Sequence, residues 1–302
     1  MDTKIKKTGC MITESNNKDT TDIDSVTTLE MVKLMNMQDH LVAEAVEKEL
    51  PYIAEAIDYI SEGFQKGGRL LYFGAGTSGR LGVLDASECM PTFGVNEEMV
   101  QGYIAGGDYA LRNAIEGAED DYQSGADMVE ELNINEKDIV VGITASGNTP
   151  YVLGAIEKAN NIGCTTIGVT NNPDTKLHDA CRVTIAPLVG PEVIQGSTRM
   201  KAGTSQKLVL NMLTTGSMIK IGKVYKNYMV DMKATNNKLF DRAIRLVMET
   251  TKVSYDKALE VLKECDFHVK LAIVMIQKEC NIEEAKELLD SANGYIAHAL
   301  DL

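Results

Sequence analysis

The chain has 302 residues, of which 44% are apolar and 25% charged, a composition typical of a soluble globular protein with a substantial core. Its formal net charge of −14 argues against a nucleic-acid-binding protein, because such proteins neutralise phosphates with clustered Lys and Arg. A phosphorylated ligand would therefore be held by local donors, such as hydroxyls and backbone N–H groups at a helix N-terminus.

The cysteines and the apolar stretches indicate the compartment. The six cysteines form no CxxC pair and have no His-based spacing, so the sequence predicts neither a zinc site nor a disulfide framework. Residues 1–17 are polar, and the most apolar later stretch, 208–221, is interrupted by polar residues. We therefore expect a cytoplasmic protein with reduced thiols, no signal peptide and no contact with a membrane.

The N-terminal region is polar at first and then helical. Roughly the first 25 residues predict an arm rather than a core element, because they carry few apolar side chains. Thr27 or Thr28 is placed to cap a helix, and Pro51 fits the first turn of a second one.

Short apolar runs that end in Gly, Ser or Thr dominate the next part of the chain. Runs of this length, rich in β-branched residues and separated by helical stretches, indicate βαβ units and a parallel sheet flanked by helices. Their ligand site is expected in the crevice at the carboxyl ends of the strands. The predicted strands are residues 70–73, 100–105, 139–143, 165–169 and 183–186.

The C-terminal part of the sequence contains an internal repeat. A long apolar helix follows Lys201, and the chain is then helical and amphipathic to its end. Ala258, Leu262 and Ala272 recur 27 residues later as alanine, leucine and alanine, which predicts two similar helix–turn–helix units in a small bundle. A structural cap or dimer-supporting domain is favoured over a protein-binding module.

Three regions are therefore expected. They are an N-terminal arm and helix over residues 1–50, a sugar-phosphate-binding α/β domain over 51–236, and a C-terminal helical domain over 237–302.

A glycine-rich loop, residues 74–80, follows the first predicted strand and opens a helix. It spells GxGxxG, but a dinucleotide site needs an acidic residue at the end of the next strand, and that strand ends in glycines at 106 and 107. A bare structural turn is a second alternative. We favour a monophosphate site, with Gly76, Thr77 and Ser78 as candidate contacts.

A second hydroxyl-rich loop follows the third predicted strand, at residues 144–150. Two such loops at neighbouring strand ends could converge on one phosphate through neutral donors, without a basic patch. The alternative is simple turn chemistry before a helix that has Pro150 in its first turn. The candidate contacts are Ser146, Gly147, Asn148 and Thr149.

Two acidic segments, residues 85–89 and 116–121, contain the candidates for acid–base chemistry. Acidic residues on helices are usually solvated, so spacing alone does not make them catalytic. Glu88 is expected on the first helix of the sheet domain or at its exit, and Glu119 at the end of the helix after the second strand. Two carboxyl groups near one site can divide acid and base roles if their environments separate their pKa values.

A third dense stretch, residues 196–204, precedes the long apolar helix. Ser197 and Lys201 could contact an anion at the helix N-terminus, and a capping role alone fits equally well.

Together, these stretches resemble the N-acetylmuramic acid 6-phosphate etherases, bacterial members of the sugar isomerase (SIS) domain group, over nearly the whole chain. The glucokinase regulatory proteins of animals look like distant relatives, although they are longer and double the SIS domain. Asn148 departs from the family's pattern, where many members have Arg, as does Met90, where Pro is common. The matching motifs are residues 13–16, 74–94, 116–121, 145–151 and 190–212.

The resemblance implies roles for particular residues. It makes Glu88 the general acid and Glu119 the base, with neither a metal nor a cofactor. It also implies a homodimer with active sites near the interface. Ser78, Ser146 and Thr149 match the phosphate-binding hydroxyls of SIS domains, and Ser87, in the motif of Glu88, is a further expected substrate contact.

Two other function classes remain open at this point. An aldose–ketose isomerase on the same scaffold would use the base but need no acid for a leaving group. A sugar-phosphate sensor would bind the same ligand without turnover. Release of lactate distinguishes the etherase from both.

Overall fold

The computed structural model describes residues 11–232 and 237–302. The chain divides into two compact units, and the second consists of Ser87–Glu97 with Thr215–Leu302. The first comprises the residues up to Ala86 together with Glu98–Thr214. The expected domain boundary after residue 236 adjoins residues 233–236, which lie outside the described residues, as do residues 1–10 of the expected arm.

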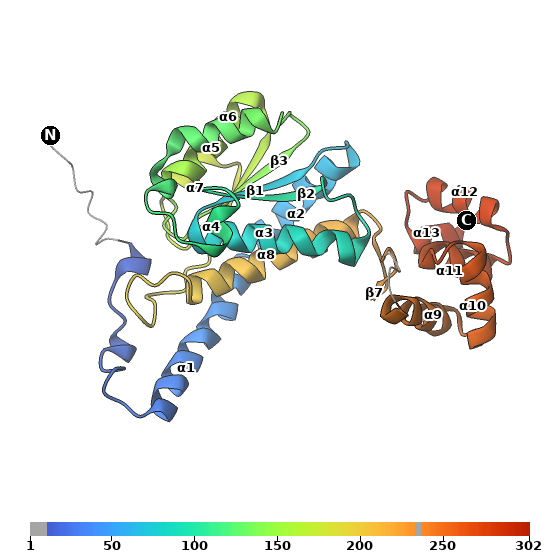
Figure 1. Cartoon of the computed structure of the whole chain (residues 1–302), viewed down its shortest axis with the longest axis horizontal. Helices are drawn as coiled ribbons and strands as arrows, with labels where there is room; N and C mark the ends of the chain where they lie inside the picture. Colours follow the sequence, from blue (N-terminus) through green and yellow to red (C-terminus); the bar gives the residue numbers. More distant parts are fainter. Residues whose placement is uncertain (1–10, 233–236) are drawn as a thin grey trace. The chain divides into compact units, whose positions relative to one another are not determined.

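A five-stranded parallel sheet forms the centre of the first unit, in the order β2-β1-β3-β4-β5 (Figure 1). All five strands fall within one residue of the predicted runs. Four of them are largely buried, as is typical of a parallel sheet covered on both faces, whereas β2 at one edge is half-buried. The strands are β1 (Leu70–Gly74), β2 (Val100–Ile104), β3 (Ile139–Ile143), β4 (Thr165–Val169) and β5 (Val183–Ile185).

Helices cover both faces of the sheet, and alternate residues of β1 show how (Figure 1). Leu71 and Phe73 are fully buried in a cluster with residues of α5 and α6. Tyr72 points to the opposite face, where its hydroxyl donates to Asp85 Oδ2 of α3 at 3.0 Å. Thr214 of α8 also donates to Asp85, at 3.1 Å. The helices are α2 (Leu50–Gln65), α3 (Gly76–Phe93), α4 (Tyr109–Arg112), α5 (Tyr122–Glu131), α6 (Pro150–Ile162), α7 (Lys176–Ala180) and α8 (Lys201–Lys220).

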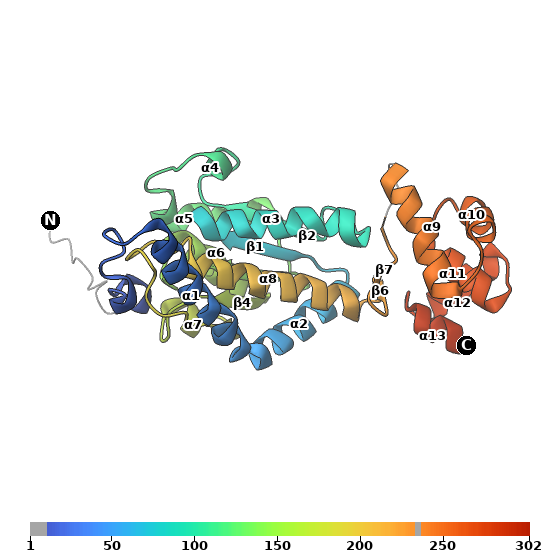
Figure 2. The same ribbon diagram turned by 90° about the horizontal axis from the view of Figure 1, so that it is seen from below.

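The N-terminal segment is more closely packed than its polar composition predicts. Thr27 caps α1 (Thr28–Glu47) in a capping box with Glu30, and α1 leads at an angle into α2 (Figure 2). Before α1, the buried Asn17 donates to Gln38 Oε1 at 2.9 Å and to a backbone carbonyl at 3.2 Å. Because these buried polar side chains have hydrogen-bond partners, their burial does not leave unsatisfied polar groups, and a polar segment can form part of the first unit.

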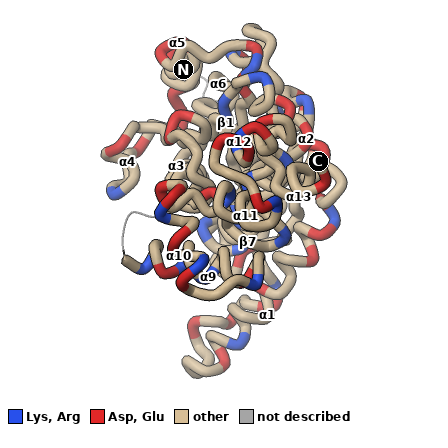
Figure 3. Tube along the Cα trace, turned by 90° about the vertical axis from the view of Figure 1, so that its right-hand side faces the viewer, with Lys and Arg blue, Asp and Glu red and all other residues tan. Residues whose placement is uncertain are grey.

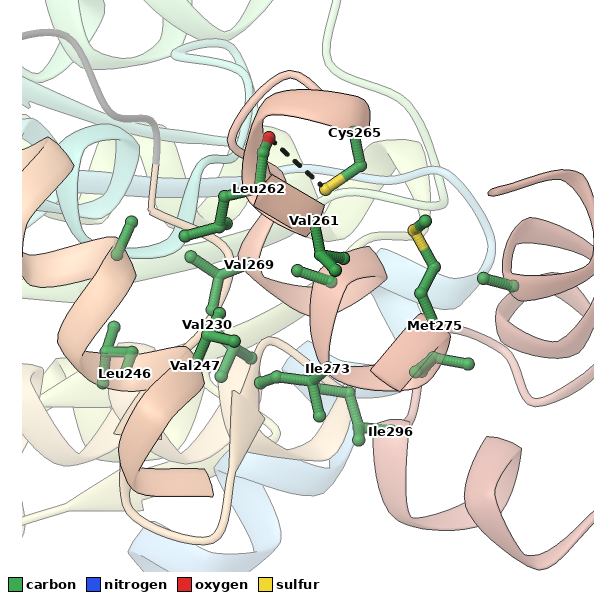
Figure 4. Close-up of a cluster of buried hydrophobic side chains, with 14 of the residues drawn as sticks. Val230, Leu246, Val247, Val261, Leu262, Cys265, Val269, Ile273, Met275 and Ile296 are labelled. Carbon is green, nitrogen blue, oxygen red and sulfur yellow. Dashed lines mark hydrogen bonds between the residues drawn. The ribbon is translucent and has the colours of Figure 1, made fainter. Parts of the chain in front are cut away.

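The second unit is helical and encloses a core of its own (Figure 4). Val247, Val261, Ile273 and Ile296 come from four of its helices and are buried together. The unit also contains a short hairpin, which the sequence analysis did not predict. Its elements are β6 (Val224–Tyr225), β7 (Tyr228–Met229), α9 (Asn237–Thr251), α10 (Tyr255–Glu264), α11 (Val269–Lys278), α12 (Ile282–Ser291) and α13 (Ile296–Asp301).

The 27-residue spacing of the sequence repeat recurs in the helix caps and turns of the second unit. Ser254 and Asn281, 27 residues apart, each cap a helix by accepting a hydrogen bond from the N–H group three residues later. Each pair of helices is joined by two left-handed residues, which are Asp266 and Phe267 in the first copy (φ 51° and 58°). The second copy has Asn293 and Gly294 there (φ 50° and 80°). The same turn is therefore built twice.

Basic and acidic residues are interspersed along the elements (Figure 3). Over the whole sequence, Lys and Arg number 30 against 44 Asp and Glu, which gives the formal net charge of −14. None of the described helices is long and apolar enough to cross a membrane.

Candidate active site

A cavity of about 850 Å³ lies where β1 and β3 end in the first unit. β2 lies on one side of β1, and β3 lies on its other side. The loops that follow β1 and β3 therefore leave neighbouring strands at the point where the strand order changes direction. Ligands of open α/β sheets bind at such a switch point. Both hydroxyl-rich loops line this cavity, and the prediction that they lie side by side is confirmed.

Glycines let the first loop turn tightly from β1 into α3. A Cβ on Gly74 would lie 2.6 Å from the backbone N of Gly79, which is too close for any side chain. Gly76 has a φ of 53°, and a Cβ there would meet no atom within 4 Å. Gly76, Thr77 and Ser78 all line the cavity.

The hydrogen of the Ser78 hydroxyl is directed away from the cavity. Asn171 Nδ2 donates to the carbonyl oxygen of Pro187 at 3.0 Å, which fixes the amide because a carbonyl only accepts. Asn171 Oδ1 therefore accepts from Gln206 Nε2 at 3.1 Å. Gln206 Oε1 then accepts from the Ser78 hydroxyl at 2.9 Å. Ser78 thus offers its oxygen lone pairs, rather than its hydrogen, to a ligand.

The second loop gathers three hydroxyls. Thr144 Oγ1 lies 2.6 Å from Thr149 Oγ1 and 3.2 Å from Ser146 Oγ. The N–H of Asn148 donates to Ser146 Oγ at 3.2 Å, so the Ser146 hydroxyl can direct its hydrogen at a ligand. All four residues line the cavity. Gly147 does not, but its φ of 68° and a Cβ position only 2.3 Å from Thr175 make glycine necessary for the turn.

The cavity has further walls, formed by the N-terminal segment, by the stretch at residues 196–204 and by Lys176. Thr13 and Glu14 line it from the N-terminal segment, and Thr13 is held by Asn172, whose Nδ2 donates to its hydroxyl at 2.9 Å. Gly196 and Lys176 line it as well. The motif at residues 13–16 was the only signal for Thr13 and Glu14, and Lys176 had none.

The two candidate glutamates are both exposed but differ in their surroundings. Glu119 had been expected at the end of a helix, but it lies on a 3-10 turn (Ala118–Asp120). The Gly117 before it has a φ of 77°, a conformation that ends regular structure. Glu119 lines the cavity. Glu88 lies on α3 as predicted, belongs to the second unit, and is not among the cavity-lining residues that the structure describes.

Three other predicted residues lie outside the lining. Ser87 is exposed and belongs to the second unit, and Ser197 lies between two residues that do line the cavity. Lys201 is 1% exposed, and its Nζ donates to Gln38 Oε1 at 2.8 Å. Burial lowers the pKa of Lys201. Its backbone N–H donates to Glu192, so Glu192 caps the N-terminus of α8.

Glu119 also lines a second, smaller cavity of about 320 Å³. The two cavities have Ala75, Gly76 and Glu119 in common, so these residues form a shared wall. Among the described residues there is no cluster of three His, Cys, Asp or Glu side chains that could hold a metal ion.

Comparison with known proteins identifies the family. Residues 51–160 match the N-terminal SIS domain of glucokinase regulatory protein, residues 120–216 match the SIS domain, and residues 226–265 match the lid domain of glucokinase regulatory protein. An N-acetylmuramic acid 6-phosphate etherase of Clostridium botulinum (strain Langeland) is 56% identical over 290 residues, which cover 96% of each chain. The chain belongs to the N-acetylmuramic acid 6-phosphate etherase family.

Membership in this etherase family extends beyond one genus. An etherase of the same name from Vibrio campbellii is 55% identical over 96% of this chain and 94% of its own. A solved structure of a proposed phosphosugar isomerase from Bacteroides fragilis, involved in capsule formation, covers 69% of this chain and 98% of its own. Its TM-score is 0.51 at 19% identity, so it supports the SIS fold alone.

Proposed function

We propose that this chain cleaves the D-lactyl ether of N-acetylmuramic acid 6-phosphate to give N-acetylglucosamine 6-phosphate and D-lactate. The observation that carries the proposal is that both hydroxyl-rich loops and Glu119 line one cavity in a member of the etherase family. We infer further that it acts in the cytoplasm as a homodimer. Incubation of the purified protein with the substrate should release D-lactate, whereas an isomerase or a sensor would release none.

The chemistry needs two carboxyl groups and proceeds by elimination followed by addition. Opening of the sugar ring gives an aldehyde at C1, which acidifies the proton on C2. Glu119 takes this proton as base, while Glu88 as acid protonates the lactyl oxygen that leaves C3. Water then adds at C3 with Glu88 as base, and Glu119 returns its proton to C2. This restores a saturated sugar and leaves both glutamates in their starting states.

The phosphate is assigned to the second loop rather than the first. Ser146 and Thr149 supply hydroxyl donors there, whereas the Ser78 hydrogen is engaged by Gln206. Lys176 is the only cation among the described residues that line the cavity, and its backbone N–H contacts Asn148 Oδ1 at 3.4 Å. Lys176 is therefore joined to the second loop at Asn148 through its backbone.

Removing the hydroxyls of the second loop should weaken phosphate binding. We expect Ser146→Ala and Thr149→Val each to raise KM about 10- to 100-fold, because a hydrogen bond to a charged group contributes about 1.5–3 kcal/mol. Steady-state release of lactate measures this. Ser124→Ala on α5, outside the cavity lining, is the matched control. Equal turnover of unphosphorylated N-acetylmuramic acid by wild type would contradict the assignment.

The ammonium of Lys176 should contribute a smaller, salt-sensitive part of the binding. Because Lys176 is exposed, its attraction for phosphate is screened by solvent and ions. We expect Lys176→Met to raise KM about 3- to 10-fold at low ionic strength and to have little effect near 1 M salt. Measuring KM against salt for both proteins tests this, and a salt-independent difference would indicate that Lys176 acts through loop structure instead.

A further inference from the structure

The smaller cavity has a composition unlike that of the larger one. Five alanines and Ile115 line it, together with Arg80, which is its only cation among the described residues. It is joined to the larger cavity through the wall that contains Gly76 and Glu119. Any ligand group in the smaller cavity is therefore beside Glu119, where the proposed reaction takes place.

Backbone carbonyl groups hold the Arg80 guanidinium in place, and no carboxylate of the described residues pairs with its charge. Its Nε donates to the carbonyl oxygen of Leu111 at 3.0 Å, and its Nη2 donates to those of Ala110 and Asn113 at 2.7 and 3.2 Å. These partners are uncharged, and Arg80 forms no ion pair with any carboxylate in the described ranges 11–232 and 237–302. A guanidinium has five N–H groups, so the two on Nη1 are left for a ligand.

A cavity in the second unit shows the contrast. It measures about 520 Å³ and is lined by Lys223 and Lys270. Both ammonium groups lie close to Asp231, at 3.1 and 2.8 Å, so their charge is already paired. Arg80 differs from these two lysines, because no carboxylate in the described part of the chain pairs with its charge.

We propose that the smaller cavity binds the lactyl group of the substrate, an inference that rests on the proposed function. The two N–H groups of Arg80 Nη1 bind the lactyl carboxylate in a planar, bidentate arrangement. The alanine side chains contact the lactyl methyl group. Glu116 and Glu119 also line this cavity and would repel a carboxylate. The lactyl carboxylate must therefore contact Arg80 directly. Arg80 is thus a specificity-determining residue for a short 2-oxy carboxylate.

The test compares ligands that differ only in this group. Wild type should prefer N-acetylmuramic acid 6-phosphate over its lactamide, which lacks the negative charge, by about 10- to 100-fold in KM. Arg80→Met should reduce this preference to below about 3-fold while leaving the Kd for N-acetylglucosamine 6-phosphate, which has no lactyl group, unchanged. Arg112→Met removes a nearby exposed charge outside the cavity lining and should keep the wild-type preference.

A second variant guards against misfolding, because Arg80 also supports residues 110–113. Ala114 is exposed and lines the cavity, so Ala114→Leu fills the space without removing a hydrogen bond of Arg80. It should raise KM for the substrate at least about 10-fold and leave the Kd of N-acetylglucosamine 6-phosphate unchanged.

Two outcomes would overturn the lactyl site. One is a preserved acid-over-amide preference in a folded Arg80→Met protein. The other is a parallel loss of affinity for substrate and N-acetylglucosamine 6-phosphate in Ala114→Leu. Failure of the proposed function would look different, because wild type would then release no lactate. Calorimetric binding of the acid and the amide would still test the site in that case.

Discussion

Replacing Glu119 with Gln should abolish both lactate release and exchange of the C2 proton with solvent deuterium. Gln has the size of Glu but cannot accept the proton, and a general base contributes about 10²–10⁴-fold to the rate. Glu119 lines both cavities, which we propose to hold the sugar phosphate and the lactyl group. NMR of the substrate in deuterium oxide measures exchange, and an enzymatic assay measures lactate.

The control for this experiment is Glu131→Gln, which removes an exposed glutamate of α5 outside both cavity linings. It should retain wild-type exchange and release. Near-normal C2 exchange in Glu119→Gln would rule out Glu119 as the base.

Replacing Glu88 with Gln should separate the two halves of the reaction. Lactate release should fall by about 10²–10⁴-fold, because the leaving oxygen is no longer protonated. Exchange at C2 should persist, because Glu119 is intact. A substrate with a better leaving group at C3 should recover part of the rate. Normal lactate release from N-acetylmuramic acid 6-phosphate by this variant would exclude Glu88 as the acid.

Mixing the two inactive variants tests whether a homodimer combines glutamates from different chains. If each site takes Glu88 from one chain and Glu119 from the other, a mixed dimer has one intact site and one with both substitutions. Random exchange makes half of the dimers mixed, so about a quarter of wild-type activity should return. If both glutamates act within one chain, refolding the mixture should restore nothing.

The strands could be predicted from the sequence because their signal is local. Residues 139–143 and 165–169 are apolar, β-branched and bounded by turn residues, and both formed the predicted strands. The repeat was equally visible, since its caps and turns recur at a fixed spacing. The hairpin of β6 and β7 was not, because two-residue strands carry too little pattern to distinguish from a loop.

The site was only partly predictable because its contacts join distant parts of the chain. Thr13 reaches the second loop through Asn172, 159 residues further along, and a polar segment gives no periodic signal for such a contact. Lys201 and Arg80 illustrate the same limit. Both are cations in conspicuous motifs. Lys201 is buried and donates a hydrogen bond to Gln38, whereas Arg80 lines a cavity, and this difference is set by tertiary packing.

The wall shared by the two cavities has a stereochemical consequence. If the lactyl group leaves C3 into the smaller cavity, that cavity is emptied when lactate departs, and water can then occupy it beside Glu119. Water arriving from this side attacks the same face of the planar, unsaturated intermediate that the lactyl oxygen left. The new hydroxyl therefore takes the configuration of the old ether, so the product is the gluco sugar rather than its C3 epimer.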